Sequence, residues 1–158
     1  MMVLRILRAA IAGALAWWVG MQLFFGQAQA LLADPNLQSA KMSAIYELAP
    51  PARIAVDPWL LPVGMFVTAL FQAACFAFIR RGLPAGLVAR GLAFGGVAWG
   101  LFTPWFEFYL PWSLMLEPTL LVLVEMLCWG GIMALVGLAI SLAFGRDVAA
   151  REGSDGAR

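Results

Sequence analysis

The sequence predicts an all-α integral membrane protein, a bundle of four transmembrane helices with a short amphipathic helix in its first outer loop. Of the 158 residues, 63% are hydrophobic and 12% are charged, whereas soluble domains contain about 45–50% and about 25%. A soluble domain of this size cannot shield so much apolar surface from water. Four apolar segments also approach the ~20 residues that a helix needs to cross the hydrocarbon core. Backbone groups in lipid must bond within their own segment, so these segments are expected to be helices.

The predicted spans cover about residues 6–28, 59–79, 91–110 and 119–144, in a single domain over residues 1–145. The first span has a rival interpretation as a cleaved signal peptide, because a basic start and an Ala28-Gln29-Ala30 ending fit that pattern. Its apolar stretch is longer than the usual 7–15 residues and contains Trp17 and Trp18, which favours a retained helix. Residues 146–158 are expected to form a short polar tail on the cytoplasmic side.

The first outer loop is predicted to contain an amphipathic helix over residues 35–48. Asp34 supplies an N-cap acceptor, and Pro35 suits the first helical position. Apolar residues then recur at helical spacing from Leu37 to Leu48, as in a helix that lies along the membrane surface. Two prolines end the pattern. A plain surface loop is the alternative interpretation of this segment.

The distribution of basic residues predicts the orientation of the chain. Eight of the ten Lys and Arg residues flank the spans on the side of the two chain ends, and Lys41 and Arg53 lie on the other side. Basic residues are retained on the cytoplasmic side of bacterial membranes. We therefore expect a multi-pass protein of the bacterial inner membrane with both termini in the cytoplasm.

Small residues are spaced for close helix packing. The third span contains two Gly-x-x-x-Gly pairs, Gly91 with Gly95 and Gly96 with Gly100, and the fourth carries a small-residue stripe through Gly137. These stripes predict a tight bundle in contact with the lipid bilayer. A homodimer or a larger membrane complex would bury one of the stripes. The net charge of +1 gives no reason to expect a nucleic-acid partner.

Five polar residues within the spans form the candidate polar pocket or ion-binding site: Glu125, Glu107, Gln72, Thr68 and Thr103. Carboxylates inside a membrane are unfavourable and often functional. Their positions along the spans predict a pocket near the outer surface, and the helical spacing of Gly96, Gly100, Thr103 and Glu107 predicts that this face points into the bundle.

Each candidate also has a structural interpretation. Glu107 lies among aromatic residues typical of a membrane interface, and a buried amide such as Gln72 often only joins two helices. Glu125 lies about 140° around its helix from the small-residue stripe, so it is expected to meet the second span or a second copy of the chain. Pro104 is expected to kink the third span.

The residue types present argue against catalysis. The chain has no histidine, which removes the usual metal ligand and proton shuttle, and Cys75 and Cys128 form no redox motif. We therefore expect no metal, no cofactor and no enzymatic activity. The expected function is that of a non-enzymatic accessory, assembly or sensing subunit. The alternative is a small, dimeric proton- or cation-coupled transporter that uses the embedded glutamates.

Overall fold

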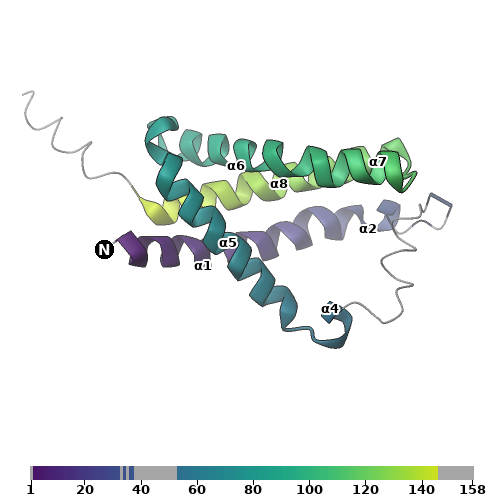
Figure 1. Cartoon of the computed structure of the whole chain (residues 1–158), viewed down its shortest axis with the longest axis horizontal. Coiled ribbons are helices and arrows are strands. Elements are labelled where there is room, and N and C mark those ends of the chain that lie inside the picture. Colours follow the sequence, from purple (N-terminus) through teal and green to yellow (C-terminus); the bar gives the residue numbers. More distant parts are fainter. Residues whose placement is uncertain (1, 33, 35, 38–52, 146–158) are drawn as a thin grey trace, which may run out of the picture.

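All regular elements in the described part of the chain are helices. The computed structural model describes residues 2–32, 34, 36–37 and 53–145. Three of its helices are long and apolar enough to span a membrane, namely Met2–Leu32, Leu60–Gly82 and Thr119–Phe144. A fourth helix runs beside the last of these (Figure 1). The predicted all-helical membrane class is confirmed, and the helices lie at the four predicted segments.

Each of the first three helices combines more than one helical type. The first consists of α1 (Met2–Gly20), a π-helical turn η1 (Met21–Phe25) and α2 (Gly26–Leu32). The second, α5 (Leu60–Ile79), follows the short α4 (Arg53–Val56) and ends in a 3₁₀ turn, Arg80–Gly82. The third consists of α6 (Leu87–Thr103), the π-helical turn η3 (Pro104–Tyr109) and α7 (Leu110–Leu114). The fourth is α8 (Thr119–Phe144).

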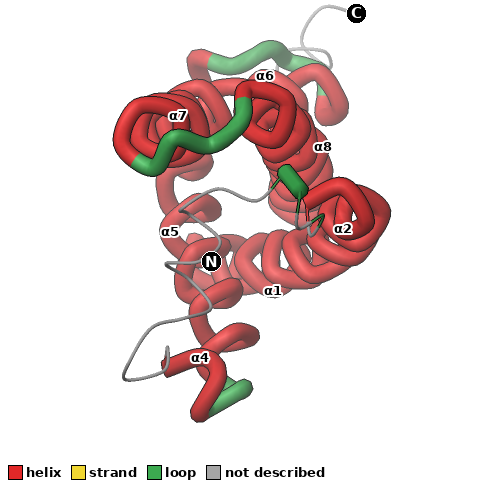
Figure 2. The backbone as a smooth tube through the Cα atoms, turned by 90° about the vertical axis from the view of Figure 1, so that its right-hand side faces the viewer, coloured by secondary structure: helices red, strands yellow, loops and turns green. Residues whose placement is uncertain are grey.

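The helix α8 is the centre of the bundle. Both α1 and α6 pack along it, whereas α5 packs mainly against α1 and crosses it obliquely (Figure 1). Viewed along the bundle, α4 at the start of this crossing helix is set apart from the other helices (Figure 2). One half of α5 therefore leans away from α6 and α8.

Glycine contacts fix the distance between α6 and α8. A Cβ atom at Gly91 would lie 2.8 Å from Leu138 Cα, and one at Gly137 would lie 2.8 Å from Gly95 N. Such contacts leave no room for a side chain. The predicted packing role of the Gly91–Gly95 pair is thus confirmed.

The prediction that the second glycine pair, Gly96 and Gly100, points into the bundle is wrong. Gly96 and Gly100 are exposed, and a Cβ atom at either would meet nothing within 4 Å. Gly96 lies about 100° around the helix from Gly95, so when Gly91 and Gly95 face α8, the second pair faces outward. The residues Gly96, Gly100, Thr103 and Glu107 therefore do not share one inward face.

The opposite half of α5 is anchored by aromatic rings. Phe76 is fully buried and lies 5.2 Å from the ring of Phe94 on α6 and 5.4 Å from that of Phe144 on α8, between centroids. The guanidinium of Arg80 lies 4.8 Å from the centroid of the Phe144 ring, in the range of a cation–π interaction. These contacts hold one end of α5 while its other end diverges.

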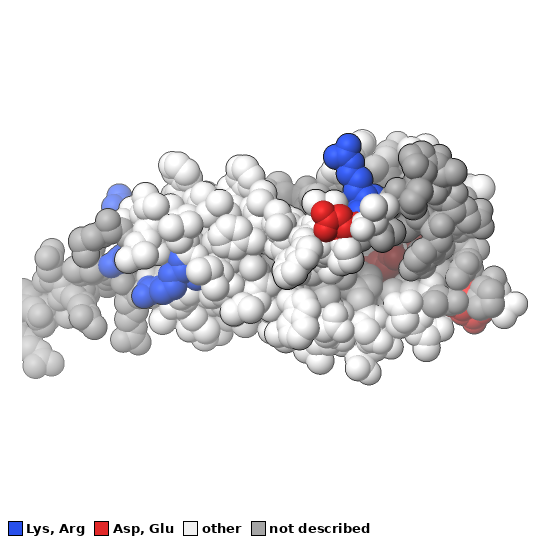
Figure 3. Space-filling view, turned by 90° about the horizontal axis from the view of Figure 1, so that it is seen from below, with Lys and Arg blue, Asp and Glu red and all other residues white. Residues whose placement is uncertain are grey.

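Charge divides the described part of the molecule into two ends. Its arginines gather at the end where α1 begins, except for Arg53, and its carboxylates lie toward the other end (Figure 3). We name these the basic end and the acidic end. The basic end contains Arg5, Arg8, Arg80, Arg81 and Arg90, and the acidic end contains Asp34, Asp57, Glu107, Glu117 and Glu125.

A π-helical turn, η3, begins at Pro104, and the kink predicted at this residue stays a prediction. Proline has no amide hydrogen to donate to the preceding turn, and a π turn bonds one residue further back than an α-helix. The amide of Leu110 accordingly donates to Trp105 O, five residues earlier. The helix continues as α7 instead of ending.

Most of the predicted outer helix, residues 35–48, lies outside the described residues, as does the tail of residues 146–158. The N-cap role predicted for Asp34 stays a prediction, because the helix itself lies outside the described residues. Asp34 Oδ1 accepts a hydrogen bond of 2.9 Å from the amide of Asn36, two residues later, which is the bond that a capping aspartate makes.

Candidate functional site

Glu125 is buried inside a membrane-spanning helix. It is 6% exposed and lies in α8, seven residues before Ile132, which contacts Gly20 of α1. Residues seven apart lie on nearly the same helix face. By this spacing Glu125 lies on the face of α8 that is turned toward the first helix. Its expected contact with the second span or with a second copy of the chain stays a prediction.

Thr103 and Glu107 lie on the neighbouring third helix. Thr103 is 1% exposed, and among the described residues its Oγ1 is buried without a hydrogen-bond partner. Glu107 is half-buried and lies in η3. Both η3 and η1 contact α8, so the two π-helical turns flank the helix that carries Glu125.

Gln72 joins three helices. Its Oε1 accepts a hydrogen bond of 3.0 Å from Trp17 Nε1 on α1, and its Nε2 donates to Met133 Sδ on α8 at 3.6 Å. Side-chain bonds of this kind hold membrane helices together. These contacts support the structural interpretation of Gln72, in which its buried amide joins helices.

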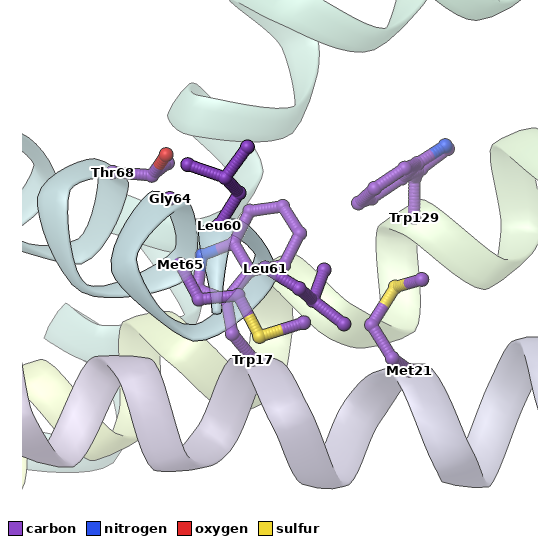
Figure 4. A pocket seen from close by; sticks show the side chains of 8 residues that line it. All are labelled: Trp17, Met21, Leu60, Leu61, Gly64, Met65, Thr68 and Trp129. Carbon is purple, nitrogen blue, oxygen red and sulfur yellow. The ribbon is translucent and has the colours of Figure 1, made fainter. Parts of the chain in front are cut away.

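Thr68 lines an apolar groove of about 290 Å³ between α1, α5 and α8 (Figure 4). The groove exists because the diverging half of α5 leaves a space beside α1. Rings from two helices form part of its wall, since Trp17 and Trp129 make an edge-to-face contact at 5.2 Å between centroids. The lining residues are Trp17, Met21, Leu60, Leu61, Gly64, Met65, Thr68 and Trp129.

The five candidate residues fall into two groups. Glu125, Thr103 and Glu107 lie on α8 and on the third helix, which pack together, whereas Thr68 and Gln72 lie on α5, which packs mainly against α1. A common pocket for all five stays a prediction. The structure places Thr68 in the groove, and it uses Gln72 to connect α5 to α1 and α8.

Two features of the site were not predicted. Glu117 lies two residues before α8 and is only 3% exposed, which places a second buried carboxylate at the acidic end. Trp17 and Trp129 face the groove instead of a membrane interface. The sequence did contain a signal for this placement. Both tryptophans lie near the middle of their spans, whereas tryptophans of an interfacial aromatic belt lie at the ends of spans.

The arrangement defines a small helical membrane protein that crosses the bilayer several times. Among the described residues, no group of three or more His, Cys, Asp or Glu side chains is placed to hold a metal ion. Comparison of the chain with protein-family models, with curated proteins and with solved structures finds no match.

Proposed function

We propose that the protein is a non-enzymatic accessory, assembly or sensing subunit of a larger complex in the bacterial inner membrane, with both termini in the cytoplasm. The observation that carries this proposal is the outward orientation of Gly96 and Gly100 on α6, where a Cβ atom would meet nothing within 4 Å. A Gly-x-x-x-Gly pair allows two membrane helices to approach closely. Here the pair faces away from the chain's own bundle.

The groove beside α5 supports the same proposal. Neighbouring helices pack by inserting side chains between one another, and this groove of about 290 Å³ lies open beside Gly64, at which a Cβ atom would also meet nothing within 4 Å. Apolar side chains of a partner helix suit its lining. The distribution of basic residues along the sequence supports the cytoplasmic placement of the termini.

The decisive experiment measures the size of the assembly in native membranes. Extracts in mild detergent are separated by native electrophoresis, and the chain is expected to migrate with a partner well above its own 17.1 kDa. The variants Gly96→Leu and Gly100→Leu are expected to release it. Gly26→Leu is the matched control, because Gly26 is also an exposed helical glycine with open space around it.

Two outcomes would contradict this proposal. Migration of the wild-type chain alone, confirmed by cross-linking in intact membranes, would exclude a stable complex. Release by Gly26→Leu as complete as that by Gly100→Leu would show that the exposed pair on α6 has no specific role.

A second candidate function is suggested by Glu125, because a carboxylate that is 6% exposed within a spanning helix is typical of proton- and cation-coupled carriers. A carrier predicts that Glu125→Gln abolishes proton- or cation-dependent uptake while the protein is still inserted in the membrane. An accessory subunit predicts that Glu125→Gln and Glu107→Gln leave the native assembly intact. Uptake by the Glu125→Gln variant therefore separates the two functions, because only a carrier predicts that it is abolished.

A further inference from the structure

A second groove lies at the basic end, between the first turns of α1 and the last residue of α8. It has a volume of about 740 Å³, and it combines two guanidinium groups with an apolar surface. The groove beside Thr68, in contrast, is lined almost entirely by apolar groups. The residues that line this second groove are Leu4, Arg5, Leu7, Arg8, Ile11, Phe144 and Gly145.

Two other arginines of the basic end have contacts within the protein. Arg80 lies over the ring of Phe144 at 4.8 Å, on a residue that also lines the groove. Arg90 donates from Nε to Pro84 O and from an Nη atom to Ala85 O, each at 3.1 Å. Arg5 and Arg8 are the two guanidinium groups that line the groove itself.

The charge of the described residues around the groove favours an anion. Every carboxylate in the described ranges lies at the acidic end, whereas Arg80 adds a positive charge behind Phe144. Guanidinium groups bind phosphate oxygens with two parallel hydrogen bonds. Arg5 and Arg8 are three residues apart on α1, so they lie on adjacent turns of the same helix face.

Apolar residues of α1 lie beside the two arginines, at Leu4 and Leu7, and Ile11 lies deeper along the span. Leu4, Leu7 and Ile11 lie along the same part of α1, and Ile11 is about 9 Å further along the helix than Arg5 at 1.5 Å per residue. An elongated hydrocarbon chain beside these residues would have its polar head at the arginines. Few ligands other than a membrane lipid combine these two parts.

We propose that this groove binds one anionic phospholipid from the leaflet at the basic end. Arg5 and Arg8 hold the phosphate, and Leu4, Leu7 and Ile11 contact an acyl chain. Basic pockets between membrane helices recognise anionic head groups in this way. The lipid bridges the first and last helices of the bundle, because α1 and α8 both line the groove.

The proposal is tested by lipid titration of the purified full chain in detergent, followed by native mass spectrometry. Dioleoylphosphatidylglycerol is expected to bind as a single retained molecule, and dioleoylphosphatidylcholine to be retained much less. Arg5→Gln and Arg8→Gln are each expected to weaken retention about fivefold, and the double variant about thirtyfold. Arg81→Gln is the matched control, because Arg81 is an exposed arginine at the same end but does not line the groove.

A second pair of variants tests the acyl chain without changing any charge. Leu7→Trp is expected to fill the groove and to weaken retention of phosphatidylglycerol several-fold, whereas Val3→Trp, at an exposed position outside the groove, is expected to have no effect. Free sn-glycerol 3-phosphate is expected not to compete with the lipid at equal concentration.

Three results would overturn the proposal. An effect of Arg81→Gln equal to that of Arg5→Gln would show general attraction to a basic surface. Effective competition by sn-glycerol 3-phosphate would show an anion site with no lipid specificity. Equal retention of phosphatidylglycerol and phosphatidylcholine would show that the two arginines do not select the head group.

Discussion

At Gly137 the backbones of α6 and α8 approach so closely that there is no space for a single added methyl group. A Cβ atom there would lie 2.8 Å from Gly95 N and 3.0 Å from Gly95 Cα, both of them backbone atoms. Backbone atoms cannot move aside as a flexible side chain can. The neighbouring helix would therefore have to shift as a unit.

We predict that Gly137→Ala lowers the stability of the bundle by about 1–3 kcal/mol, the usual effect of overpacking. Gly96→Ala should leave stability unchanged or raise it by up to about 1 kcal/mol, because alanine is the better helix former and the site is open. Thermal unfolding in detergent micelles measures both effects. Equal shifts in the two variants would contradict the assigned packing.

Gln72 offers a second test at the scale of single residues. Trp17 Nε1 donates to Gln72 Oε1 at 3.0 Å, and hydrogen bonds between membrane helices contribute about 0.6 kcal/mol on average. A double-mutant cycle with Trp17→Phe and Gln72→Leu should give a coupling free energy of about that size. A coupling free energy of zero would mean that the bond adds nothing to the stability of the bundle.

At the scale of elements, the two π-helical turns are the main departure from four regular helices. Both η1 and η3 contact α8, and each changes the rotation of the helix that follows it. In a π-helical turn the amide bonds one residue further back than in an α-helix, so the turn holds about one extra residue. The orientation of α7 relative to α6 therefore depends on η3.

We predict that the deletion of Phe106 from η3 is tolerated, because the turn can become α-helical while the flanking residues keep their faces. The deletion of Val97 from α6 is the matched control, since both side chains are exposed. That deletion should rotate the following residues by about 100° and disrupt the bundle. Size-exclusion profiles of the two variants, labelled with a fluorescent protein, measure the difference. Comparable loss of folded protein in both would contradict this account of η3.

At the scale of the whole molecule, charge segregation predicts how the bundle lies in the bilayer. The arginines of the basic end and the carboxylates of the acidic end are separated by the apolar length of the helices (Figure 3). The excess of Lys and Arg close to the spans directs orientation. The basic end should therefore be cytoplasmic.

Cysteine labelling tests this orientation. In a background of Cys75→Ser and Cys128→Ser, a membrane-impermeant maleimide added to intact cells should label Val56→Cys and should spare Arg81→Cys until the membrane is opened. Both positions are exposed. The reverse pattern would show that the basic end is outside. Alkaline carbonate should leave the protein in the membrane fraction, as expected for spanning helices.

Hydrophobicity and length are properties of the chain alone, so the sequence was sufficient to predict the helices and the all-helical membrane class. The glycine pair Gly91–Gly95 was likewise predicted correctly, because close approach in lipid requires small residues wherever two helices meet.

The rotation of each helix about its axis could be decided only by the tertiary structure. Two glycine pairs follow each other directly on α6, Gly91 with Gly95 and Gly96 with Gly100, and local sequence gives no reason to prefer one of them over the other as the face toward α8. The same uncertainty affected the face of α8 that carries Glu125, which the contact of Ile132 with Gly20 turns toward the first helix. The lean of α5 depends on Phe76 packing with rings from α6 and α8, and contacts between distant segments of this kind leave no periodic pattern in the sequence.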